Sequence, residues 1–123
     1  SKQAVEASQA FLAAARKYKE AVKQDYVSFA KEKYEMVTAG RSAVLDAENS
    51  LQTWGWLPGW TESLENDITA SKKRLADLEK ELEGKRESSK MMLADAEKEI
   101  KAAEEQVELA FHIQLIPSKN QVG

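Results

Sequence analysis

Residues 54–60 read Trp-Gly-Trp-Leu-Pro-Gly-Trp (WGWLPGW), and they hold all three tryptophans of the 123-residue chain. Pro58 lacks an amide hydrogen, so a helix that reaches it cannot continue. Gly55 and Gly59 can both adopt positive φ angles at little steric cost. The stretch therefore predicts a tight turn between two helices, with Thr61 as the N-cap of the second helix.

Apolar residues recur every three or four positions on both sides of this turn, close to the period of a helix that buries one face. We call these positions the seam. Before the turn the seam is expected at Ala4, Ser8, Phe11, Ala15, Tyr18, Val22, Tyr26, Phe29, Lys33, Val37, Gly40, Val44, Ala47, Leu51 and Trp54. After the turn it is expected at Leu64, Ile68, Ser71, Leu75, Leu78, Leu82, Lys85, Ser89, Leu93, Ala96, Ile100, Ala103, Val107, Ala110 and Gln114. The spacing predicts helices over residues 2–53 and 61–115.

Folding the chain back at residues 57–59 brings the two halves of the seam together in one register. In every pair the midpoint between the two residue numbers falls at or just after Gly59. Examples are Trp54 with Leu64, Val44 with Leu75, Val22 with Ala96 and Phe11 with Val107. A constant register is what antiparallel packing of equal helices requires. The sequence therefore predicts one all-α domain, a coiled-coil-like antiparallel two-helix hairpin about 75 Å long at a rise of about 1.5 Å per residue. Pro117 is expected to end the second helix and leave residues 117–123 as a loose tail.

The middle of the seam is polar. In the expected register Lys33 faces Lys85, and Phe29 faces Ser89. A polar layer of this kind fixes the register of paired helices. A hinge at this point is the other interpretation, and it is the less favoured of the two.

The end of the hairpin opposite the turn, which we call the base, carries more apolar side chains than one seam can bury. They are Val5, Phe11, Leu12, Val107, Leu109, Phe111, Ile113, Leu115 and Ile116. Leaving several of them in water would promote aggregation. We expect the hairpin to self-associate into a four-helix bundle through Leu12, Leu109, Phe111 and Ile113. The alternative is that the base packs against another part of a longer protein, from which a chain that begins at Ser1 is expected to be excised.

Composition argues against several functional classes. The net charge of −3 offers no concentrated basic surface, so nucleic acid is not expected as a partner. The chain has no cysteine, and His112 is its only histidine, so we expect no metal site, no cofactor and no catalytic residues. No apolar run is long enough to span a membrane, and no recognisable targeting signal indicates a cellular location.

The clustered tryptophans have three interpretations. Trp54 and Trp60 can close the end of the seam while Trp56 and Leu57 remain exposed at the apex. The exposed residues can then dock into a protein partner, because tryptophan is enriched in binding hot spots. They can also insert shallowly into a membrane surface, where tryptophan is likewise enriched. The absence of Lys and Arg from residues 42–71 argues against an anionic membrane.

These features favour a non-enzymatic structural or interaction module, a self-associating helical rod that presents an aromatic tip to a protein partner. The alternative is a membrane-active hairpin, either a remodelling scaffold or a component of a pore-forming or translocating toxin, whose tryptophans contact lipid. The two hypotheses share a fold and differ in what the turn contacts.

Overall fold

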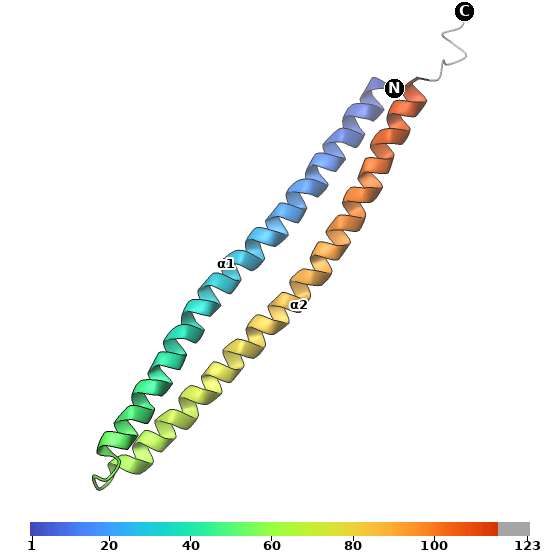
Figure 1. The fold of residues 1–123 in the computed structure, drawn as a ribbon. Helices are drawn as coiled ribbons and strands as arrows, with labels where there is room; N and C mark the ends of the chain where they lie inside the picture. Colours follow the sequence, from blue (N-terminus) through green and yellow to red (C-terminus); the bar gives the residue numbers. More distant parts are fainter. Residues whose placement is uncertain (116–123) are drawn as a thin grey trace, which may run out of the picture. The chain divides into compact units, whose positions relative to one another are not determined.

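The computed structural model describes residues 1–115. It contains two α-helices, α1 (Lys2–Trp54) and α2 (Trp60–Gln114), joined by residues 55–59 (Figure 1). The helices pack against each other as an antiparallel hairpin, and residues 1–115 contain no strand, so the predicted all-α helical hairpin is confirmed. The predicted tail, residues 117–123, lies outside the described residues, as does Ile116.

Contacts within the chain divide the hairpin into two compact units, each of which combines a segment of α1 with a segment of α2. The terminal unit is Ser1–Asp25 with Ser88–Gly123, and the turn unit is Tyr26–Glu87. The buried side chains of the terminal unit are small, and the largest of them is Ile100. The turn unit buries only Val37, Val44 and Ile68.

The predicted seam of α2 agrees closely with the observed burial. Every residue of α2 that is buried or half-buried is a predicted seam position, and of the predicted positions only Gln114 is exposed. A strict alternation of steps of three and four residues keeps one face of a helix turned towards its neighbour. The spacing alone was therefore sufficient to identify the packed face of α2.

In the terminal unit the predicted seam of α1 is wrong at three positions, because Ala4, Phe11 and Tyr18 are all exposed. The other predicted positions of this segment, Ser8, Ala15 and Val22, are packed. In place of the three exposed residues, the packed positions lie one residue later, at Val5, Leu12 and Lys19. Spacing cannot distinguish the predicted positions from the observed ones. Phe11 and Leu12, for example, both lie three or four residues from the seam positions Ser8 and Ala15. Lys19 can occupy a packed position because its aliphatic stem lies along the seam while its ammonium group contacts the carboxylate of Glu97.

In the turn unit the α1 seam is as predicted from Tyr26 to Leu51, and only Trp54 at its end is exposed. The polar part of this seam is organised around one aromatic ring. The ammonium nitrogens of Lys33 and Lys85 each lie 5.4 Å from the centroid of the Phe29 ring. Lys33 also lies 3.2 Å from a carboxylate oxygen of Glu81 on α2.

Ion pairs link α1 and α2 within both units. In the terminal unit they join Arg16 to Glu104 and Lys19 to Glu97; in the turn unit they join Lys33 to Glu81, Arg41 to Glu79, and Glu48 to Lys72. Most of these side chains are well exposed, so each pair contributes only about 0–1 kcal/mol to stability. Their main significance is geometric, because every one of them agrees with antiparallel pairing.

Candidate interaction sites

The turn between the helices is held by backbone hydrogen bonds. The amide of Leu57 donates to the carbonyl oxygen of Trp54 at 3.0 Å, and the amide of Trp60 donates to that of Leu57 at 3.2 Å. Gly59 reverses the chain with a φ of 82°, a left-handed conformation that side chains other than glycine rarely adopt. These bonds fix the path of the backbone through the turn, residues 54–60.

Gly55 and Thr61 form the junction between the helices in a way that differs from the prediction. Gly55 does not have a positive φ; its amide donates to the carbonyl oxygen of Leu51 at 2.8 Å and extends the helical pattern of α1. Thr61 is not the N-cap, because Gly59 reverses the chain early enough for α2 to begin at Trp60. Its hydroxyl instead donates to the carbonyl oxygen of Gly55 and so satisfies the end of α1.

The tip, which we define as Trp54, Trp56, Leu57 and Trp60, is largely exposed. The Trp56 side chain is 74% exposed, while Trp54 and Trp60, which were expected to close the seam, are 48% and 51% exposed. Leu57 is half-buried. The indole N–H of Trp56 donates to the carbonyl oxygen of Thr53 at 2.9 Å, so the one polar group of this ring is occupied while its apolar surface faces solvent.

The flanks of the tip are acidic. Residues 42–71 contain no Lys or Arg. Their carboxylates are Asp46, Glu48, Glu62, Glu65 and Asp67. The nearest cation on α2, Lys72, lies 3.4 Å from a carboxylate oxygen of Glu48 and marks the edge of this region. The tip therefore combines an apolar apex with a negatively charged surround.

The residues predicted to form contacts at the base do not share one surface. Leu12 is half-buried in the seam of the terminal unit. Leu109 and Ile113 line a shallow groove of about 220 Å³ together with Ser1, Ala4, Ser8, Gln106 and Ala110. Phe111 is exposed and does not line this groove. Of the other apolar residues of the base, Val5 is buried although it was not a predicted seam position, and Val107 is half-buried as its seam position predicts.

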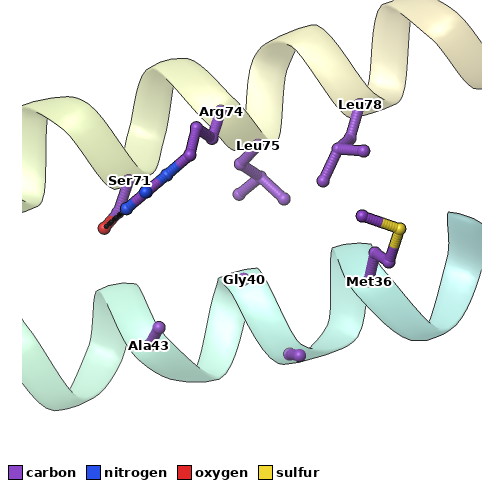
Figure 2. A pocket seen from close by; sticks show the side chains of 8 residues that line it. Met36, Gly40, Ala43, Ser71, Arg74, Leu75 and Leu78 are labelled. Atoms are coloured by element: carbon purple, nitrogen blue, oxygen red, sulfur yellow. Dashed lines mark hydrogen bonds between the residues drawn. The ribbon is translucent and has the colours of Figure 1, made fainter.

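A second groove, in the turn unit, was not predicted. It has a volume of about 370 Å³ and is lined by Met36, Ala39, Gly40, Ala43, Ser71, Arg74, Leu75 and Leu78. Figure 2 shows Met36, Leu75 and Leu78 directed into the space between the helices, and Arg74 extended towards Ser71. The groove exists because Gly40 has no side chain opposite Leu75. A glycine among small residues at seam spacing was the signal for it.

Residues 1–115 contain no group of three or more His, Cys, Asp or Glu side chains arranged to hold a metal ion. His112 is exposed near the end of α2. Neither α1 nor α2 contains a stretch of the length and hydrophobicity that crossing a membrane requires.

No protein-family model matches this chain, and comparisons with curated proteins and with solved structures also gave no match. The exposed tip and the two grooves are therefore the features from which a function can be inferred. The tip is the more specific of them, because it gathers the largest exposed side chains of the turn unit within one short loop.

Proposed function

We propose that this chain is a non-enzymatic interaction module whose tip docks into an apolar pocket of a protein partner. The observation that carries this proposal is the exposed ring of Trp56, whose N–H is bonded to the carbonyl oxygen of Thr53. A ring in this state can enter an apolar pocket without leaving an unpaired hydrogen-bond donor, which would otherwise weaken binding. Burying its exposed surface is worth about 3 kcal/mol at about 25 cal/mol per Å².

The turn also supports docking because it is already ordered. Hydrogen bonds hold Leu57 and Trp60, and the Thr61 hydroxyl ties the start of α2 to the end of α1. Ordering a flexible side chain on binding costs about 0.5–1.5 kcal/mol, and a pre-ordered loop avoids part of that cost. A rigid aromatic apex is typical of the anchor residues of protein interfaces.

The charges around the tip indicate the chemistry of the partner. The carboxylates on both sides of the apex, such as Glu48 and Glu62, favour a partner pocket rimmed by Lys or Arg. The same carboxylates oppose approach to an anionic lipid surface. These charges are the reason for preferring a protein to a membrane.

A membrane-active hairpin is the second candidate. It is favoured by the indoles of Trp54 and Trp60, which are half-exposed beside Trp56 and so form an aromatic apex of the kind found at membrane interfaces. Because of the acidic flanks, this candidate requires a lipid surface without net negative charge.

Vesicles and photocrosslinking separate the two candidates. Tryptophan emission is recorded with neutral phosphatidylcholine vesicles and with vesicles containing phosphatidylserine. A blue shift that is lost in Trp56→Ala supports the membrane candidate and contradicts protein docking. If emission does not change, a photoreactive residue at position 56 is expected to crosslink one protein of the source cell, and Glu62→Lys with Glu65→Lys is expected to abolish that product. The same photoreactive residue at Leu45, an exposed position of α1 outside the tip, is the matched control.

A further inference from the structure

A second apolar stripe runs along α1 in the terminal unit, beside the seam. It consists of Ala4, Ala7, Phe11, Ala14, Tyr18 and Ala21, all of which are exposed. Their steps of three and four residues keep them on one face of the helix. Phe11 and Tyr18 are 60% and 45% exposed, which is a large aromatic surface to leave in water.

The stripe makes the two faces of the terminal unit unlike each other. Ala4, the first residue of the stripe, lines the groove that also contains Leu109 and Ile113 of α2, so the apolar face extends onto the second helix. The charged side chain of Arg16 follows Phe11 by five residues, about 140° around the helix, and pairs with Glu104. The exposed apolar stripe and the Arg16–Glu104 ion pair therefore lie on different faces of α1.

We propose that the stripe binds the same stripe of a second copy of this chain, with the two α1 helices antiparallel, to form a four-helix arrangement. The sizes of the side chains are self-complementary in this orientation. If the symmetry axis passes between Leu12 and Ala13, Phe11 lies opposite Ala14 of the second copy, Tyr18 opposite Ala7, and Ala4 opposite Ala21. Each large ring then meets a methyl group, as packing of a knob into a hole requires.

Charge favours the same arrangement. The residues beside the outer edge of the stripe are Gln3, Ala10, Lys17 and Gln24. Lys17 is the only charged residue among them. In the antiparallel dimer Lys17 comes level with Ser8 of the second copy. Measured along the helix axis, Glu6 of the second copy is then only about 3 Å away. Among these edge residues of α1, no like charges face each other; like charges at this edge would cost stability in a helix pair.

The area of the contact predicts a reversible dimer. The stripe is about 27 Å long, and a stable interface buries about 800 Å² on each partner. The exposed parts of Phe11 and Tyr18 supply on the order of 200 Å². The rest has to come from the alanines and from Leu109 and Ile113, so association is expected at micromolar concentrations. The tip takes no part in this contact, so dimerisation through the stripe does not depend on docking of the tip into a partner.

Sedimentation equilibrium with two matched variants tests the surface. Ala13 and Ala14 are adjacent exposed residues of α1, and only Ala14 belongs to the stripe. The unmodified chain and Ala13→Glu are expected to form dimers, while Ala14→Glu is expected to weaken dimerisation at least tenfold with an unchanged helical circular dichroism spectrum. A monomer at several hundred micromolar, or equal association of the two variants, would overturn the proposal.

Disulfide trapping tests the orientation, because the chain contains no cysteine. A mixture of an Ala4→Cys chain with an Ala21→Cys chain is expected to give the mixed covalent dimer on mild oxidation. An Ala13→Cys chain is expected to remain uncrosslinked under the same conditions. A dominant disulfide between two Ala4→Cys chains would indicate parallel helices and contradict the proposal.

Discussion

The indole N–H of Trp56 donates a 2.9 Å hydrogen bond to the carbonyl oxygen of Thr53, one turn back at the end of α1. This bond satisfies a carbonyl group that the end of a helix would otherwise leave to water. It also fixes how the ring projects from the turn. Trp56 thus stabilises the loop from which it is presented.

Replacing Trp56 with phenylalanine separates these two roles. The variant keeps an apolar ring but loses the N–H, so the free energy of unfolding is expected to fall by about 0.5–1 kcal/mol. Docking through the ring is expected to survive in Trp56→Phe and to be lost in Trp56→Ala. Thermal unfolding followed by circular dichroism measures the first effect, and an unchanged midpoint would show that the bond contributes nothing.

Gly59 is expected to tolerate no side chain without cost. Its φ of 82° strains any residue with a Cβ, so Gly59→Ala is expected to destabilise the hairpin by about 1 kcal/mol. Gly59→Asn should cost less, because asparagine adopts left-handed backbone conformations more readily than alanine. Urea unfolding of the two variants gives the comparison, and equal losses would argue against the left-handed turn.

Gly40 and Gly84 provide a matched pair of helical glycines. A Cβ at Gly84 meets no atom within 4 Å, so Gly84→Ala is expected to stabilise the chain by about 0.5–1 kcal/mol through helix propensity alone. A Cβ at Gly40 would lie 3.5 Å from Cδ1 of Leu75, an ordinary packing distance. Gly40→Ala is therefore expected to gain several tenths of a kcal/mol more, because it also fills the groove between the helices. Denaturation midpoints that rank the variants the other way would show that the groove is already closed.

The Phe29 ring is expected to couple energetically to Lys85. The ammonium nitrogen lies 5.4 Å from the ring centroid, within the range of a cation–π interaction worth about 0.5–1 kcal/mol at a partly exposed site. A double-mutant cycle with Phe29→Leu and Lys85→Gln measures that coupling. Simple additivity of the two single changes would mean that the ring serves only as packing.

The contribution of Lys19 to the stability of the hairpin is expected to be lost at alkaline pH. The hydrogen bond to the Glu97 carboxylate raises the pKa of Lys19 above its ordinary value of 10.5, against the opposing effect of burial and with support from the charges of Glu97 and Glu20. The stabilisation is therefore complete below pH 10.5 and is lost as the pH rises through the higher pKa of the folded state. Lys19→Met is expected to flatten this alkaline decline, whereas Lys31→Met, at an exposed position, should leave it in place. Thermal midpoints between pH 9 and 12 provide the measurement.

The sequence was sufficient to predict the hairpin, because a proline and two glycines interrupt a spacing that resumes in the same register. It could not choose between Phe11 and Leu12 for the packed face, since both satisfy steps of three and four. Phe11 was chosen as the packed residue because its side chain is larger than that of Leu12. The structure instead packs Leu12 in place of Phe11, and Lys19 in place of Tyr18, and the Lys19 ammonium group pairs with the Glu97 carboxylate.

At the turn, the spacing predicted where the chain reverses but not how its ends are satisfied. The hydroxyl of Thr61 was expected to cap α2, and it bonds back to Gly55 because the left-handed Gly59 shifts the start of α2 by one residue. No sequence pattern predicted the hydrogen bond from the Trp56 indole to the Thr53 carbonyl oxygen. Such details follow from the path of the backbone, which a pattern of residue types does not specify.

The absence of Lys and Arg from residues 42–71 also makes this region convenient to follow by proteolysis. Trypsin cuts after Arg41 and Lys72 but nowhere between them, so a complete digest releases the whole turn, with every indole of the chain, as one peptide covering residues 42–72. Any label, crosslink or oxidation acquired by a tryptophan is then carried by a single fragment that absorbs at 280 nm.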